Sequence, residues 1–332
     1  IAFVFPISVA VPSLGVGMMV GINSVIARAL GEGDDERAAR RGNFGIVLSV
    51  GLGILLGLLL FALLDPLFSL MQAGEQELPL IRTYMQPFSF GFPLMMAIMG
   101  INGTLRGQGE ARKTSLVSIS YAAANWVLDP VLITGAFGFE GYGMAGAAYA
   151  TLIGWAIGIA VGLWLLSGTN IPFSLARLRQ CNLSESASEI LRVAGPASFS
   201  NAINPVGLSV LTALIASESV AAVAGFGAAG RVQSFAIVPL LALSGSIGAI
   251  VGQNWGAKQF DRAREAMWFA GLFCVGYGLI TAALLAWGGS WFADMFSEDP
   301  DVTNQFANYL RIAAWGYAGF GVLIVANGAL NA

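Results

Sequence analysis

The sequence contains no histidine, and only 11% of its 332 residues are charged. Without histidine there is no imidazole proton relay and no histidine-ligated metal, so any proton chemistry must use carboxylates. A soluble globular domain carries about 25% charged residues. A chain this poor in charge, with 56% apolar residues, is predicted to have lipid rather than water as its solvent.

Several other functional signals are also missing. The two cysteines, Cys181 and Cys274, are far apart, so they predict neither a disulfide framework nor a metal site. The net charge of −3 comes without a basic tract that would bind nucleic acid. The Gly-x-Gly at Gly31 and Gly33 follows a predicted helix and lacks the remaining pattern of a nucleotide-binding loop. We therefore expect no cofactor, no nucleic-acid partner and no enzymatic activity.

Long apolar runs fill most of the chain. A membrane-spanning helix needs about 20 mostly apolar residues. Such runs, each bounded by a short polar or Gly/Pro-rich break, occur at about 1–28, 43–64, 85–105, 115–136, 143–167, 190–217, 220–252, 266–292 and 306–330. The sequence thus predicts nine spanning helices and an all-α integral membrane protein, multi-pass in a bacterial or archaeal inner (plasma) membrane.

The basic residues mark one side of the membrane. Thirteen of the sixteen lysines and arginines lie in the loops of one side: Arg28, Arg37, Arg40, Arg41, Arg106, Arg112, Lys113, Arg177, Arg179, Arg192, Lys258, Arg262 and Arg264. The positive-inside rule places these loops in the cytoplasm.

An internal repeat recurs after 225 residues. Its matches are Gly31 with Gly256, 36–38 with 261–263, Tyr84 with Tyr309, and 102–105 with 327–330. Because both copies of each loop are cytoplasmic, the repeats are parallel and predict two helical lobes. Symmetry then implies a twelve-helix parent, with one helix missing before residue 1 and two after residue 332. We predict a first lobe at 1–168, a cytoplasmic linker at 169–189 and a second lobe at 190–332.

Asp129 is the one acid inside a predicted span. An ionisable residue within the membrane is a functional-site hypothesis by default. Asn125 lies four residues earlier on the same helix face, and Pro130 frees a backbone carbonyl for a ligand or water. Burial disfavours the charged carboxylate, so protonation or Na⁺ binding here can be coupled to shape. The alternative is a structural aspartate that bonds a neighbouring helix near the outer interface.

Weaker candidates lie in the second half. Arg231 is the only basic residue within a span, and Gln233 lies close by. Together they suggest a gate or a substrate contact. The alternative is that the arginine side chain satisfies backbone carbonyls between helices, or extends its charged end to the membrane surface. Asn201 and Asn204 suggest a cavity lining, or hydrogen bonds across helices. Gly53-x-x-x-Gly57 and Gly154-x-x-x-Gly158 are best explained by close helix packing.

Several motifs occur together in one order along the chain. They are 27–34 (Ala-Arg-Ala-Leu-Gly-Glu-Gly-Asp), 105–110 (Leu-Arg-Gly-Gln-Gly-Glu), Asn125-x-x-Leu128-Asp129-Pro130, 146–151 (Gly-Ala-Ala-Tyr-Ala-Thr) and 253–257 (Gln-Asn-Trp-Gly-Ala). With this set the chain resembles the MATE (multidrug and toxic compound extrusion) family over essentially its whole length. The resemblance implies two six-helix lobes around a cavity that opens alternately to either side, with helices two to ten present here.

The resemblance also implies a coupling-ion site. In the DinF-like branch of the family, that site resembles Asn125, Asp129 and Thr151, together with an aspartate of the absent first helix. The NorM branch keeps carboxylates in helices seven and ten, but here helix seven has Asn201 and Asn204, and 305–330 has no acid. The departure favours the DinF-like branch and leaves H⁺ and Na⁺ both open.

The expected function is a secondary antiporter that exports small, amphipathic or cationic organic compounds in exchange for H⁺ or Na⁺. We expect it to act as a monomer in contact with membrane lipid. The alternative is a flippase of lipid-linked saccharides from the same broad superfamily. Such flippases line their cavity with several basic residues, whereas only Arg231 is available here.

Overall fold

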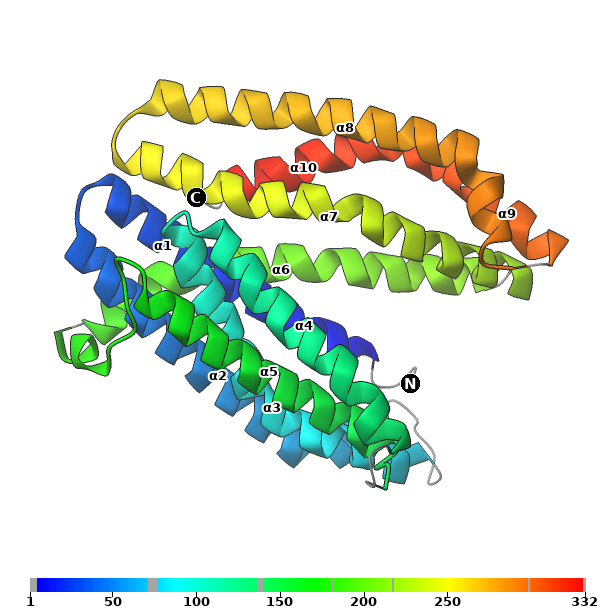
Figure 1. The fold of residues 1–332 in the computed structure, drawn as a ribbon, viewed down its shortest axis with the longest axis horizontal. Helices are drawn as coiled ribbons and strands as arrows, with labels where there is room; N and C mark the ends of the chain where they lie inside the picture. The colour runs from blue at the N-terminus through cyan, green and yellow to red at the C-terminus, as the bar shows by residue number, and fades with distance from the viewer. Residues whose placement is uncertain are drawn as a thin grey trace. The chain divides into compact units, whose positions relative to one another are not determined.

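The structure is a computed structural model that describes residues 5–70, 77–135, 140–180, 182–216, 218–297 and 299–330. In these ranges the chain is almost entirely helical (Figure 1). Its elements are α1 (Phe5–Gly31), α2 (Asp35–Leu70), α3 (Glu77–Gly107), α4 (Ala111–Thr134), α5 (Met144–Ser167), the 3₁₀ turn η1 (Leu175–Gln180), α6 (Leu183–Ala216), α7 (Val220–Gly256), α8 (Phe260–Asp294), α9 (Pro300–Ala313), the 3₁₀ turn η2 (Ala314–Gly316) and α10 (Tyr317–Leu330).

The predicted membrane helices are present in this structure. Among the described residues, eight helical stretches are long and apolar enough to cross a membrane. Residues 190–216 of the ninth predicted run, 190–217, lie in the continuous helix α6, and residue 217 lies outside the described residues. Most helices extend past the predicted apolar runs. One reason is that polar residues at their ends, such as Asp35 and Glu36 in the first turn of α2, also favour a helix start.

The last predicted span differs in one respect. A single helix was expected over 306–330, but the 3₁₀ turn η2 interrupts it between α9 and α10. The turn ends at Gly316, and a glycine weakens a regular helix. The expectation of one unbroken helix was therefore wrong at this point, although the stretch from Pro300 to Leu330 still has the length and apolar character of one span.

The internal repeat appears in the turns as well as in the helices. α1 ends at Gly31 and α7 at Gly256, and the helices that follow begin at Asp35 and Phe260. In both turns the residue 225 positions apart has a positive φ, which is +79° at Gly33 and +58° at Lys258. The backbone bonds also match. Asp34 N–H donates to Ala29 C=O at 2.9 Å, and Gln259 N–H donates to Asn254 C=O at 2.8 Å, as in a Schellman-type helix end.

The chain divides into two compact units, Ile1–Ala202 and Ile203–Ala332. In the first, α3 packs against α1, α2 and α5, while α4 packs mainly against α5. In the second, α7 to α10 pack on one another. The boundary between the units falls inside α6, and the predicted linker at 169–189 remains a prediction as a division between transport lobes.

Glycines bring the helices of the first unit close together. A Cβ on Gly53 would lie 2.8 Å from the carbonyl oxygen of Phe92, and one on Gly57 would lie 2.5 Å from that of Ser89. The second glycine motif faces α4, since a Cβ on Gly154 would lie 3.0 Å from the carbonyl oxygen of Tyr121. The packing role predicted for both glycine motifs is confirmed.

Candidate ion-binding site

The candidate site lies on the helix pair α4 and α5. These two helices run side by side after the short connection that follows Gly135 (Figure 1). Their close approach at Gly154 places the polar faces of both helices against each other. α4 carries Asn125 and Asp129 one helical turn apart, and α5 carries Thr151.

The structure brings these three predicted residues together. In the amide orientation that satisfies both atoms, Asn125 Nδ2 donates to Asp129 Oδ2 at 2.9 Å. Asn125 Oδ1 then lies 3.3 Å from Thr151 Oγ1, and Thr151 Oγ1 also lies 2.9 Å from the carbonyl oxygen of Ala147, to which it can donate. Asn125 thus links the carboxylate on α4 to the hydroxyl on α5.

The carboxylate has polar companions and is partly buried. Pro130 lies within α4 and has no N–H, so the carbonyl four residues earlier, at Trp126, loses its helical donor. Carboxylate, amide and hydroxyl oxygens, with a free carbonyl nearby, are the hard oxygen ligands that suit a small cation. The same set can hold a proton on the carboxylate.

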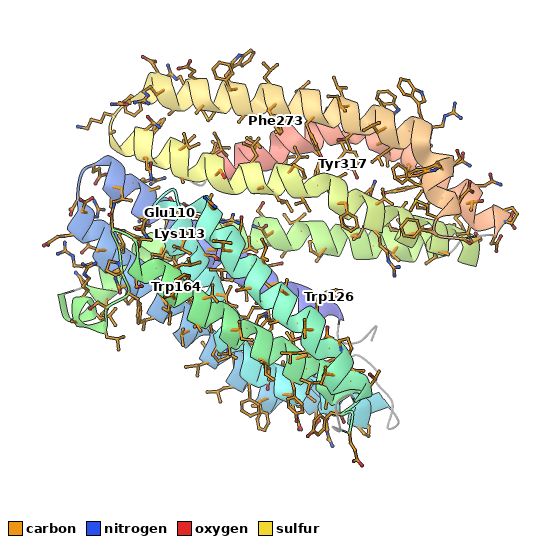
Figure 2. The ribbon with its side chains drawn as sticks, viewed as in Figure 1. Glu110, Lys113, Trp126, Trp164, Phe273 and Tyr317 are labelled. Atoms are coloured by element: carbon orange, nitrogen blue, oxygen red, sulfur yellow. The ribbon has the colours of Figure 1, made fainter. Side chains whose placement is uncertain are left out.

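A pocket of about 380 Å³ opens beside these residues. Its other lining residues are Tyr121, Ala122, Trp126 and Trp155. Trp126 extends from α4 with 80% of its surface exposed (Figure 2). Aromatic faces beside a carboxylate attract organic cations. The arrangement therefore suits a small ion at the carboxylate, an organic cation over the rings, or each in turn.

Sequence reasoning did not select the three aromatic residues, although helical spacing points to two of them. Tyr121 precedes Asn125 by four residues, and Trp155 follows Thr151 by four. On a helix, residues four apart share a face. Reading each polar candidate with its neighbours at this spacing would have found both rings.

The weaker candidates have the following surroundings, each within its own unit. Asn201 Nδ2 donates to the carbonyl of Ala197 in its own helix at 2.7 Å, and the side chain of Asn204 lies outside the described residues. In the second unit, Gln233 Oε1 accepts from Tyr309 OH at 3.3 Å. Arg231 is exposed on α7.

Comparison with known proteins identifies the family. The MatE family model matches residues 1–131 and 196–332. The chain is 31% identical to a protein named FAD transporter from Shewanella oneidensis, over all of this chain and 74% of that protein. It is 28% identical to the probable multidrug resistance protein YpnP of Bacillus subtilis, over 95% of this chain and 70% of the relative.

Solved structures give the same result. The Vibrio cholerae MATE transporter VcmN in its bent form superposes with a TM-score of 0.89 at 26% identity, covering 99% of this chain and 74% of that one. The resemblance, the helical membrane fold and the transporter class expected from the sequence are thereby confirmed. This chain belongs to the MatE family of multi-pass membrane transporters, which are efflux proteins rather than enzymes.

Proposed function

We propose that this transporter exports small amphipathic or cationic organic compounds in exchange for H⁺ or Na⁺, and that Asp129 binds the coupling ion with Asn125 and Thr151. The observation that supports the proposal is the carboxylate itself. Asp129 lies within a membrane-spanning helix, 2.9 Å from an amide donor. A carboxylate in such a place is costly, so its presence favours a functional role.

The aromatic lining supports a cationic substrate. Tyr121, Trp126 and Trp155 offer ring faces next to one negative charge, and a cation over such a face gains about 0.5–2 kcal/mol. An anion would meet the Asp129 carboxylate at the same place and be repelled. The coupling ion and the substrate are then both cations that bind at the same carboxylate. Binding of one can displace the other, which makes exchange possible.

A second candidate substrate is a flavin dinucleotide. The observation that favours it is the 31% identity to the FAD transporter over the whole of this chain. Its phosphates would need cations, and Arg231 is the only basic residue near the middle of a predicted span rather than close to its end. The flippase alternative meets the same shortage of basic residues.

The test is efflux from proteoliposomes loaded with ethidium or with FAD, under an imposed H⁺ or Na⁺ gradient. We expect gradient-dependent ethidium efflux that Asp129→Asn abolishes. The matched control is Glu140→Gln, because Glu140 is an exposed acid beyond the end of α4 and should be dispensable. Undiminished gradient-dependent efflux in Asp129→Asn would refute the coupling role, and FAD efflux without ethidium efflux would favour the second candidate.

A further inference from the structure

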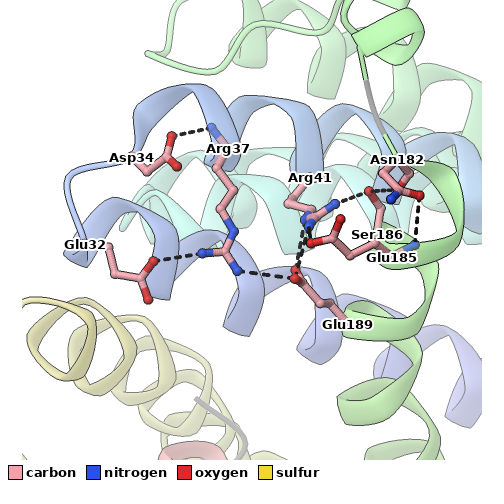
Figure 3. Close-up of polar contacts among 8 residues, drawn as sticks. All are labelled: Glu32, Asp34, Arg37, Arg41, Asn182, Glu185, Ser186 and Glu189. Carbon is pink, nitrogen blue, oxygen red and sulfur yellow. Dashed lines mark hydrogen bonds and ion pairs between the residues drawn. The ribbon is translucent and has the colours of Figure 1, made fainter.

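A buried arginine ties the second helix of the chain to the start of α6. The side chain of Arg41, on α2, is only 8% exposed. It faces Glu189 as a fork, with Nε 2.9 Å from Oε2 and Nη2 donating to Oε1 at 3.0 Å. Nη2 also donates to Glu185 at 3.2 Å, and Nη1 donates to the hydroxyl of Ser186 (Figure 3). Three side chains of α6 thus converge on one guanidinium.

A second arginine extends the same cluster. Arg37 donates to Glu189 Oε1 at 3.3 Å and to Glu32 Oε2 at 2.9 Å (Figure 3). Both arginines therefore share Glu189. We call the set Arg37, Arg41, Glu185, Ser186 and Glu189 the latch. Paired and hydrogen-bonded charges that are partly buried are costly to separate, because each partner left behind is unsatisfied.

Next to the latch, α1 and α6 touch through small residues. A Cβ on Gly21 would lie 2.6 Å from the carbonyl oxygen of Ile190 and 3.0 Å from the Cβ of Ala194. One turn earlier on α1, a Cβ on Gly17 would lie 2.6 Å from the carbonyl oxygen of Ala194 and would overlap Ser198. We call this contact the seam. Small residues let the backbones approach closely without interlocking side chains, so the two helices can separate without repacking.

In the second copy of the repeat, the described residues form no such cluster. The counterpart of Arg37 is Arg262, which donates to Gln259 in its own turn at 2.9 Å. The counterpart of Arg41 is Ala266. The pair of arginines that holds Glu189 is therefore not repeated in the second copy.

We propose that the seam, held shut by the latch, is the cytoplasmic gate of this transporter. The latch lies among the loops that the charge pattern places in the cytoplasm, and the seam continues from it toward the middle of the membrane. Asn201 follows one turn beyond Ser198 along α6. An exporter must open its binding region to each side in turn, and opening this contact gives the cytoplasm access past Ser198. The proposal rests on the transporter family and not on the role of Asp129.

The test measures access to the seam with no substrate. In a background with Cys181→Ser and Cys274→Ala, a thiol is introduced by Ser198→Cys in the seam. A second protein carries Ser49→Cys as the matched control, because Ser49 lies in the α2–α3 contact, where a Cβ on Gly100 would be 3.1 Å from its Oγ. Both hydroxyls donate to the carbonyl four residues earlier, at 2.7 and 2.8 Å. A membrane-impermeant maleimide is added to inside-out vesicles and the labelling rates are compared.

The latch is then weakened by Glu189→Gln. We expect labelling at position 198 to rise about tenfold, the factor that corresponds to 1.4 kcal/mol, with less than a twofold change at position 49. Glu36→Gln is the control for the loss of charge, because Glu36 pairs with Arg40 inside α2 at 3.2 Å. Arg41→Lys, which keeps the charge and loses the fork, should act like Glu189→Gln. An unchanged rate at position 198 in both latch variants, or an equal rise at both positions, would overturn the proposal.

Discussion

Replacing Gly57 by alanine tests whether the α2–α3 contact is as close as the structure places it. The added Cβ would lie 2.5 Å from the carbonyl oxygen of Ser89. The obstructing atom belongs to the backbone, so a change of side-chain rotamer cannot relieve the clash. Overpacking of this kind costs about 1–3 kcal/mol. Gly57→Ala should therefore lower the free energy of unfolding by that amount.

The same helix supplies the control. Gly51 lies on α2 one and a half turns earlier, and a Cβ there would meet nothing within 4 Å. Gly51→Ala should be neutral or should stabilise the protein by up to about 1 kcal/mol, because alanine has the higher helix propensity. Both variants add one methyl group to an apolar helix, so their difference reports the contact alone.

The assay is reversible unfolding of the two variants in mixed lipid–detergent micelles. A loss in Gly57→Ala of at least about 1 kcal/mol relative to Gly51→Ala supports the packing, by the same estimate. Equal stabilities in the two variants would refute the reasoning, since they would mean that α3 does not face α2 at Ser89.

Three further predictions concern the site and the repeat. Thr151→Val removes the hydroxyl beside Asn125. It should lower ion-coupled efflux from proteoliposomes about 2- to 10-fold, the range for one net hydrogen bond. Thr151→Ser keeps the hydroxyl and should stay near the wild-type rate. Trp126→Ala should weaken binding of an organic cation about 2- to 5-fold by loss of one exposed ring contact, measured by fluorescence titration. Trp164→Ala should not, because Trp164 is also exposed but lies outside the pocket. Lys258→Gly should raise the free energy of unfolding by about 0.5–1 kcal/mol. Relief of the left-handed strain at φ +58°, about 1–2 kcal/mol, exceeds the entropic cost of glycine, about 0.5–1 kcal/mol. No gain would mean that Lys258 does not adopt the turn seen at Gly33.

The helices were predictable because lipid imposes one simple rule on a spanning segment, namely length with few charges. The parallel repeat was also visible in the sequence, and the turns at Gly33 and Lys258 confirm it. The helix ends were less predictable. The polar residues that extend α2 lie outside its apolar run, so that run does not show where the helix begins. The break at Gly316 was not predicted, because a glycine within an apolar run can indicate either close helix packing or a break in the helix.

The candidate site was predictable in part. Asn125 and Asp129 are one turn apart on one helix, so spacing alone joins them. Thr151 is 26 residues from Asn125 on another helix, and only the family resemblance selected it before the structure placed it there. The latch was not predicted at all. Arg41 and Glu189 are 148 residues apart on different helices, so no local spacing joins them.

The measurement that tests the central claim most directly is ion movement driven by substrate. Proteoliposomes with no ion gradient are given an ethidium gradient, and the counterflow of H⁺ or ²²Na⁺ is followed. We expect the wild-type protein to move one of these ions against the ethidium flux and Asp129→Asn to move neither. Ion counterflow that persists in Asp129→Asn would show that the coupling ion binds elsewhere.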